Sequence, residues 1–498
     1  MLRTKVDPQP TLWEAILPPE FLALPPGLEQ IDRLLDDPVF FEPFVPFFDP
    51  VIGRPSIPME TYLRMMFLRF RYRLGFETLC AEVADSLAWR RFCRIAITDA
   101  VPHPSTLMKI TTRCGPGAVE QLNEALLQKA LAAKVVKLDK VRADTTVVRA
   151  NVAYPTDSGL LARGVAKLTK TVGAIKAAGL ARRTLFRDRT RSVRRRAHQI
   201  AAWLRRRSGD AKDEVLVLTG ELATIAEAST KEAQVVAQNA RRALRRAGQG
   251  ASGKAAALIT ELERTIGVLE AIVAQTRTRL CGEVPDGSTR LVSLHDTDAR
   301  PIAKGRLGKP IEFGFKAQVT DNADGIVVDH NVEMGNPPDA PMPGAAIGRI
   351  KKRFSKAPRA ATADRGYGEA KVEAELHELG VTHVAIPRKG RPGAQRQAVE
   401  SSRRFRKLIK WRTGSEGRIS HLKHSWGWER TMLDGIDGAR TWCGWGVLAY
   451  NATKIAGLID ERDTTKRTTN SSNLPTPPRA TTPEQSGRPP PPAHRVPA

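Results

Sequence analysis

Cysteine is scarce in this chain of 498 residues, and its five cysteines are scattered without a Cys-x-x-Cys pair. That spacing argues against a disulfide framework and against a zinc site. Charged residues interrupt every apolar run before it reaches the roughly 18 to 20 residues that span a bilayer. The N-terminus shows no signal-peptide pattern, and Walker A, Rossmann and Gly-x-Ser-x-Gly motifs are absent. These absences predict a cytoplasmic protein in a reducing setting, with no membrane partner.

Negative charge is also in short supply. The chain has 79 Lys and Arg against 53 Asp and Glu, which gives a net charge of +26 and a pI near 10.3. A strongly basic protein favours a polyanionic partner. Nucleic acid is the first expectation, and an anionic membrane surface is the second.

The basic excess is concentrated in one segment that lacks proline, residues 158–284. Ala, Arg, Leu and Lys dominate it, which predicts a helical hairpin or a coiled-coil-like insertion. Between Arg163 and Arg207 there are fifteen Lys and Arg, and Asp188 is the only acid. A charge run is usually a solvated face, but one this one-sided repels itself unless it meets phosphate. The residues expected to contact a nucleic-acid backbone are Arg194, Arg195, Arg196, Arg205, Arg206 and Arg207.

The two ends of the chain differ from its centre. Helical spacing of apolar residues over Met59–Phe67 and Phe76–Ala84, with Gly75 between them, predicts short helices in an N-terminal domain. Such helices suit DNA binding, and equally suit packing or dimerisation. From about Thr464 the chain is rich in Thr, Pro, Ser and Arg, which predicts disorder.

Strand and helix patterns alternate on both sides of the insertion. Strands are predicted at 135–139, 141–148, 290–294, 313–320 and 325–329, with a hairpin turn at 321–325. A helix at 347–354, a strand ending at Asp364, a helix at 369–379, a strand at 381–387 and a helix carrying Glu416 follow. This order predicts an α/β mixed sheet of ribonuclease-H-like type, with an N-terminal helical domain and a long basic helical insertion. The predicted divisions are 1–130 (helical domain), 131–157 and 285–460 (catalytic core), 158–284 (insertion) and 461–498 (tail).

Three acids stand in settings that suit metal binding. Asp144 lies in an apolar strand, Asp364 ends a strand before Gly366, and Glu416 lies on a later helix. Functional side chains of an open α/β sheet gather at strand ends. Carboxylate oxygens suit Mg²⁺, and two such ions about 3.5 to 4 Å apart can assist an in-line displacement at a phosphodiester.

Each acid also has a structural interpretation. A strand aspartate such as Asp144 is often a hydrogen-bonded structural residue, and an aspartate before glycine, such as Asp364, often only makes a turn. Thr413-x-x-Glu416 fits a capping box. If that cap forms, Arg412 lies outside the helix, and only Glu416 and Lys423 share a helical face.

Together these motifs resemble the DDE transposases of bacterial insertion sequences, in the class with a Tyr-x2-Arg-x3-Glu-x6-Lys signature. Arg412, Glu416 and Lys423 fit its spacing, and Ile409 occupies the tyrosine position. The segment 364–367 (Asp-Arg-Gly-Tyr) is similar to the motif around that family's second acid, and 142–146 is similar to the first. The resemblance covers about residues 35–460, apart from the insertion.

The resemblance implies a ribonuclease-H-like catalytic domain in which Asp144, Asp364 and Glu416 bind Mg²⁺, which Mn²⁺ can replace. Water would attack at the transposon end, and the freed 3′-hydroxyl would attack target DNA. Arg412 and Lys423 would bind DNA phosphates near the cut. The partners implied are double-stranded DNA with terminal inverted repeats, target DNA and further copies of the chain, at the bacterial nucleoid. The alternatives are a metal-dependent nuclease that cuts without joining and a non-catalytic, DNA-binding transposase relic.

Overall fold

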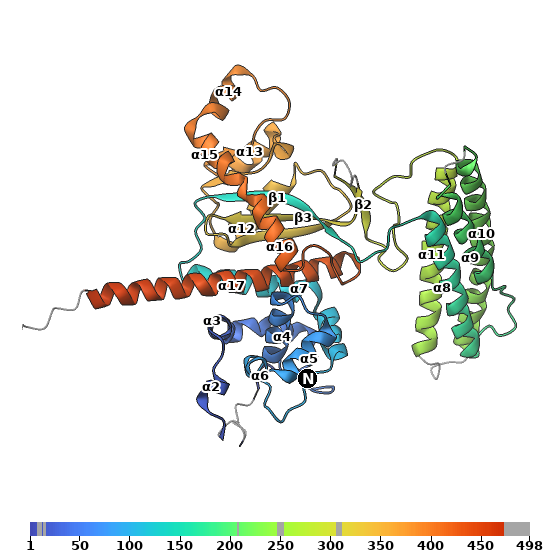
Figure 1. Cartoon of the computed structure of the whole chain (residues 1–498), viewed down its shortest axis with the longest axis horizontal. Helices are drawn as coiled ribbons and strands as arrows, with labels where there is room; N and C mark the ends of the chain where they lie inside the picture. The colour runs from blue at the N-terminus through green and yellow to red at the C-terminus, as the bar shows by residue number, and fades with distance from the viewer. Residues whose placement is uncertain (7–11, 13–15, 207–208, 247–252, 305–310, 473–498) are drawn as a thin grey trace, which may run out of the picture.

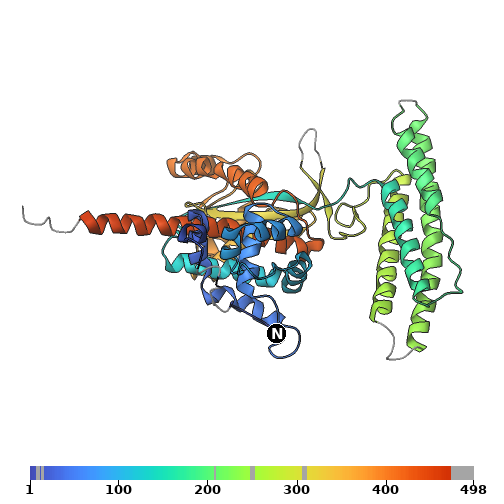
Figure 2. The same ribbon diagram turned by 60° about the horizontal axis from the view of Figure 1, so that its bottom comes forward.

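The computed structural model describes residues 1–6, 12, 16–206, 209–246, 253–304 and 311–472. Figures 1 and 2 show three parts: a group of N-terminal helices, a curled mixed sheet with its own helices, and a bundle of long helices that stands to one side. The predicted mixed α/β class is confirmed.

Within the described residues, six strands form one sheet in the order β2-β3-β1-β5-β6, and β4 also pairs with β3. The pairs β1–β3, β2–β3 and β3–β4 are antiparallel, whereas β1–β5 and β5–β6 are parallel. The strands are β1 (Val141–Arg149), β2 (Arg300–Ala303), β3 (Ile311–Asn322), β4 (Val327–Met334), β5 (Ala360–Thr362) and β6 (His383–Ala385). β1 therefore lies at the centre, between a long antiparallel strand and a short parallel one.

The central strands form where apolar residues alternate or run together. Val141, Ala143, Val147 and Val148 of β1 are buried, so both faces of this strand are covered. The predicted hairpin at 321–325 is confirmed: it joins β3 to β4, and Gly325 adopts the left-handed backbone that the turn requires, with φ +83°.

Two predicted strands are wrong. Residues 135–139 form no strand: the Val135 amide donates to the Ala130 carbonyl at the end of the preceding helix. Residues 290–294 also form no strand, because the amide and carbonyl of Leu291 bond to the side chain of Gln275 instead. In both segments the apolar residues pack against a core without a partner strand.

Helices cover both faces of the sheet. On one face, α12 (Met342–Phe354) and α13 (Ala370–Glu378) line a small apolar space with Val141 and Ala143 of β1. The other face carries α14 (Ala394–Ser401), α15 (Arg403–Arg412) and α16 (Gly414–Ser425). A short 3-10 turn, η4 (Arg365–Tyr367), follows β5.

The N-terminal helices share one core with the sheet. The long C-terminal helix α17 (Gly435–Ser472) contacts α3, α4, α7 and β4, and the rings of Tyr62 and Trp445 meet edge to face at 5.8 Å. α17 continues past residue 461, where the sequence predicts the tail to begin, and residues 473–498 lie outside the described residues. The N-terminal elements are α2 (Pro19–Leu22), α3 (Pro26–Leu35), η1 (Pro38–Phe40), η2 (Glu42–Phe47), α4 (Met59–Arg71), α5 (Phe76–Asp85), α6 (Leu87–Phe92) and α7 (Pro104–Ala132).

The bundle has a hydrophobic core of its own. Its helices are α8 (Asp157–Ala177), α9 (Thr190–Trp203), α10 (Ala211–Arg246) and α11 (Gly253–Leu280). Buried residues such as Leu168, Leu222 and Leu269 form a cluster separate from the main core. The bundle joins the sheet through the segments that follow β1 and precede β2 (Figure 1). Among the described helices of the whole chain, none is long and apolar enough to cross a membrane.

Candidate active site

Asp144 lies in the middle of β1, on the face that α16 covers. Its Oδ2 accepts a hydrogen bond from Ser415 Oγ at 2.8 Å, and its Oδ1 accepts one from the Thr145 amide at 2.9 Å. The guanidinium of Arg412 lies 3.7 Å from the same Oδ2. The strand aspartate is therefore held by the two residues that flank the start of the helix carrying Glu416.

Asp364 follows β5, the parallel neighbour of β1. Arg142 pairs with Thr362 across these strands. Asp144 and Asp364 each lie two residues further on, so the parallel register brings the two carboxylates together. Asp364 Oδ1 accepts a hydrogen bond from the Gly366 amide at 2.7 Å, so the turn interpretation holds for this oxygen. Its Oδ2 makes no hydrogen bond within the described part of the chain.

The turn after Asp364 depends on a close backbone approach. A Cβ atom on Gly368 would lie 1.9 Å from the carbonyl oxygen of Pro387, two residues after the end of β6. Tyr367, one residue earlier, is buried, and burial raises its pKa above the ordinary value. The missing side chain at Gly368 lets this turn sit against β6, which fixes the direction of Asp364.

The surroundings of Asp144 favour its neutral form. Burial raises the pKa of Asp144, and the negative charge of Asp364 raises it further. The hydrogen bonds from Ser415 and the Thr145 amide and the positive charge of Arg412 oppose this rise. Two carboxylates close together in a partly buried place repel each other, and a bound cation would relieve that repulsion.

Glu416 lies on the first turn of α16. Thr413 makes no side-chain cap, and its Oγ1 donates to the Lys410 carbonyl at 2.8 Å instead. The capping-box interpretation of Glu416 is therefore wrong. Its carboxylate is exposed and forms no hydrogen bond or ion pair within the described residues. Glu416 follows Ser415, which touches Asp144, and about 100° of helical rotation turns it away from the aspartates.

The three acids do not form a closed set of metal ligands here. In the part of the chain that the structure describes, no three Asp, Glu, His or Cys side chains lie close enough to hold a metal ion. The structure brings together the predicted residues Asp144, Asp364 and Arg412, with Glu416 at the rim.

A buried ion network that we did not predict fixes α16 on the sheet. Asp321 of β3 accepts hydrogen bonds from Arg142 Nε at 2.8 Å and from Arg418 Nε at 3.1 Å. A Cβ on Gly414 would lie 2.3 Å from Arg142 Nη1, so glycine lets the helix start against this guanidinium. The sequence pattern assigned Asp321 only a turn role. The alternation of side chains along a strand could have pointed to this network, because it places Arg142 on the same face of the sheet as Asp144.

A fourth acid, also missed, lies on the other side of the aspartates. Asp339 Oδ1 accepts a hydrogen bond from Thr145 Oγ1 at 3.1 Å and forms a salt bridge with Lys316 Nζ at 2.8 Å. The buried Lys316 ammonium neutralises this carboxylate. Asp339 precedes α12 in a proline-rich loop, and no motif in the sequence marked it.

Lys423 lies further along α16 than the acids. Seven residues separate it from Glu416, about 10.5 Å of helix rise. Burial lowers the pKa of Lys423 to about 8; nearby Lys304 and Arg149 lower it as well, and Glu312 opposes them. The structure therefore places Lys423 in a separate cluster of cations beside β2, apart from Asp144 and Arg412.

The predicted arginines of the insertion lie on α9 and after it. Arg194, Arg195, Arg205 and Arg206 are exposed, and the Arg206 guanidinium stacks over the Trp203 ring at 4.2 Å. Arg196 is tied to Glu221 of α10 by a salt bridge. Arg207 lies outside the described residues. Arg194 and Arg195 of α9 are therefore exposed together with Arg205 and Arg206 directly after it, and we call these four residues the basic surface of α9.

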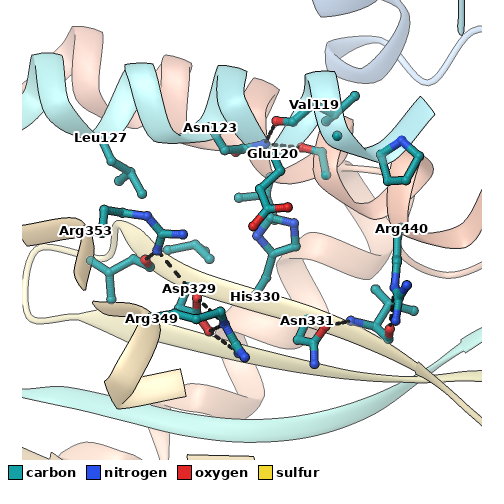
Figure 3. A pocket seen from close by; sticks show the side chains of 17 residues that line it. Val119, Glu120, Asn123, Leu127, Asp329, His330, Asn331, Arg349, Arg353 and Arg440 are labelled. Atoms are coloured by element: carbon teal, nitrogen blue, oxygen red, sulfur yellow. Dashed lines mark hydrogen bonds and ion pairs between the residues drawn. The ribbon is translucent and has the colours of Figure 1, made fainter. Parts of the chain in front are cut away.

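A cavity of about 340 Å³ lies between α7, β4, α12 and α17, away from the aspartate pair (Figure 3). Arg349 binds the buried carboxylate of Asp329 with two nitrogens, at 3.0 and 2.7 Å, and Arg353 joins Asp329 to Glu124. Burial lowers the pKa of His330, in the same lining, to about 3. These paired charges connect α7 to the sheet, which gives the cavity a structural role.

Taken together, the chain is a mixed α/β protein with an acidic site where parallel strands meet, bordered by cations. Two family models match it: the transposase domain DUF772 over residues 21–113 and the transposase DDE domain over residues 285–452. The chain therefore belongs to the DDE transposases of insertion sequences.

One curated relative is an uncharacterised protein of Rhizobium meliloti, ORF8 in the nfe locus. It is 29% identical over 136 residues, which cover 26% of this chain and 65% of the relative. The match therefore spans slightly less than two thirds of that protein. No solved structure matches the chain significantly.

Proposed function

We propose that this transposase cuts the ends of its insertion sequence and joins them to target DNA, with Asp144, Asp364 and Glu416 as the ligands of Mg²⁺ or Mn²⁺. The observation that carries the proposal is the pairing of Asp144 and Asp364 by the parallel register of β1 and β5. The contacts of Ser415 and Arg412 with Asp144 bring the start of α16 to the same place.

The order of the elements supports a ribonuclease-H-like core. β1, the β3–β4 hairpin, α12, β5, α13, β6 and α16 follow one another as the sequence predicts for that core, with β2 and the bundle inserted after β1. Asp144 then belongs to the central strand, Asp364 to the next strand and Glu416 to the helix above them. We expect the domain divisions that the sequence predicts: a helical domain at 1–130, core at 131–157 and 285–460, and the bundle within 158–284.

The donor set fits a hard divalent cation. Asp144 and Asp364 bring carboxylate oxygens together, and exposed Glu416, at the rim of the site, is the proposed third ligand. Bound divalent cations would supply the charge that activates the attacking oxygen and stabilises the leaving oxygen. Arg412 can hold a DNA phosphate beside Asp144, because its guanidinium is planar and binds phosphate with two nitrogens. Lys423 would bind phosphate further from the cut, as a point charge.

DNA ends would be recognised by other parts of the chain. The N-terminal helices and the basic surface of α9 are the proposed contacts with terminal inverted repeats, and the working unit would be a multimer that holds both ends. A protein of this kind would act at the nucleoid. A nuclease that cuts without joining, or a relic that only binds, would share these surfaces. Metal-dependent cutting of end DNA separates the relic from the other two, and a strand-transfer assay separates the nuclease from the transposase.

The test uses shape-conserving substitutions of the three acids. D144N, D364N and E416Q should each abolish Mg²⁺- or Mn²⁺-dependent cutting of end DNA while leaving DNA affinity within about twofold, because they remove ligand charge and keep shape. The matched controls are D139N and E378Q, which change exposed acids outside the site. Full cutting by any of the three variants would remove that residue from the ligand set.

A further inference from the structure

Helix α15 carries six cations and no acid in ten residues. Arg412 belongs to the candidate site, and the other five are exposed: Arg403, Arg404, Arg406, Lys407 and Lys410. We call these five the α15 basic face. In the described part of the chain none of them forms an ion pair, and the nearest acid in sequence, Glu400, is already bound by Arg396.

The rest of α15 explains how this face is presented. At about 100° per residue, the five cations occupy a single arc of about 160° on the helix. The opposite arc holds Phe405, Leu408 and Ile409, which pack with Ala360 of β5 and Ala385 of β6. The apolar stripe therefore fixes α15 on the sheet, and the cations point outward.

Such a face is unfavourable without an anionic partner. Arg403 with Lys407, and Arg406 with Lys410, are like charges spaced i, i+4, and each such pair destabilises a helix by about 0.2 to 0.5 kcal/mol. Backbone phosphates would remove this repulsion and release counterions. A lipid surface fits less well, because an interfacial helix turns its apolar stripe to the membrane, whereas the stripe of α15 is buried on the sheet.

The position of α15 indicates which DNA it would hold. The helix leads into α16 through Thr413, and its last residue, Arg412, lies 3.7 Å from Asp144. Figures 1 and 2 place α15 and the bundle on opposite sides of the central strands. The surfaces of α15 and α9 are therefore separate.

We infer that the α15 basic face binds the sugar-phosphate backbone of the duplex whose phosphate enters the site at Asp144 and Asp364. That this duplex is the one being cut rests on the proposed function. The contact between α15 and backbone phosphate is independent of that function, and it can be measured without any cutting.

The experiment compares the salt dependence of DNA binding in full-length proteins. The probe is a random-sequence duplex of about 30 base pairs, followed by fluorescence anisotropy. The slope of log K against log salt is negative, and changing all five residues to Gln should lower its magnitude by about 0.9 for each phosphate that is no longer neutralised, or by about 2.7 to 4.5 for three to five phosphates. The thermal midpoint should stay equal or rise, because repulsion within α15 is removed.

A matched pair provides the control. K407Q/K410Q should lower the slope by about 1.8, whereas K351Q/K352Q, which changes two exposed lysines of α12 on the other sheet face, should leave it within about 0.5. Equal slopes in the α15 and α12 variants would overturn the inference. It would also be overturned if the variant with all five α15 residues changed kept the parent slope for DNA but lost binding to phosphatidylserine vesicles. A parent protein that binds the duplex but never cuts an end would refute the proposed function alone.

Discussion

Ser415 Oγ donates a hydrogen bond to Asp144 Oδ2 at 2.8 Å, across 271 positions of sequence. The bond joins the first turn of α16 to the central strand, so the helix that carries Glu416 cannot shift without disturbing Asp144. It also lowers the pKa of Asp144, against the effect of burial. A small hydroxyl thus orients the strand carboxylate and favours its charged form against the effect of burial.

Changing Ser415 to Ala should therefore slow cleavage and leave DNA binding intact. A hydrogen bond to a charged group contributes about 1.5 to 3 kcal/mol, so we expect a fall of roughly 10- to 160-fold in the single-turnover cutting rate. S420A, at an exposed position of the same helix, is the control and should cut at the parent rate. Equal rates for both variants would show that Ser415 does not position Asp144.

The buried ion network should be essential for folding. Asp321→Ala leaves the guanidinium groups of Arg142 and Arg418 without their partner, and breaking a buried pair costs about 3 to 5 kcal/mol. Asp324→Ala removes a more exposed pair with Lys137 in the same hairpin and should cost under about 1 kcal/mol. Urea unfolding followed by circular dichroism measures both. A loss under about 1 kcal/mol for D321A would contradict the network's role.

Lys423 should make DNA affinity depend on pH. Because its pKa is lowered to about 8, its positive charge is present below pH 8 and is lost as pH rises through that value. Affinity for end DNA should therefore weaken between pH 7 and pH 9. Arginine stays protonated over this range, so K423R should remove the part of the pH dependence of DNA affinity that comes from Lys423. Identical pH profiles for the two proteins would exclude Lys423 from the DNA contact.

His330 should make folding stability depend on pH in the acid range. Its folded pKa of about 3 lies below its unfolded value of about 6.5, so the unfolded state binds the proton first. The contribution of neutral His330 to the free energy of unfolding is fully present above pH 6.5. It falls by up to about 1.4 kcal/mol per pH unit as pH drops towards 3. H330Q should flatten the curve of unfolding free energy against pH, and H424Q, at an exposed histidine, should not.

The bundle should fold alone and bind DNA through α9. Its separate core predicts that a fragment of residues 156–284 melts cooperatively as a helical protein. In the full chain, Ala at Arg194, Arg195, Arg196, Arg205, Arg206 and Arg207 should lower the salt slope by about 0.9 for each phosphate that these residues neutralise, for all sequences alike. R196A alone should have little effect, because Arg196 pairs with Glu221. An unchanged slope in the full set would make the bundle a solvated spacer.

Local patterns predicted the elements whose apolar residues face a core. The strand around Asp144, the hairpin at 321–325 and the helix carrying Glu416 are present as expected. Segments 135–139 and 290–294 failed because their backbone groups find other partners than a regular strand. Val135 bonds to the end of the preceding helix, the Leu138 and Asp139 carbonyls accept from the Arg359 and Ala360 amides at the start of β5, and Leu291 bonds to the Gln275 side chain. A hydrophobic pattern predicts that a segment is buried, but it does not predict whether a partner strand lies beside it.

The position of a candidate residue could be predicted where a motif marks it, and its role stays a prediction. Strand order suggested that Asp144 and Asp364 lie close together, and the family resemblance suggested Arg412 near them. Asp339 and Asp321 could not be found in this way, because their partners Lys316 and Arg142 come from distant positions that only the folded sheet brings near. The capping box at Thr413 failed for a local reason: its hydroxyl bonds backwards to Lys410.

The length of the bundle sets a scale for the DNA that the protein can cover. α10 has 36 residues, about 54 Å of helix, which equals the rise of roughly 16 base pairs of B-form DNA. The bundle stands beside the sheet on two connecting segments, so phosphates bound by α9 would lie well away from those at Asp144. We propose that an insertion of this size sets the spacing between an outer recognition sequence and the point of cleavage.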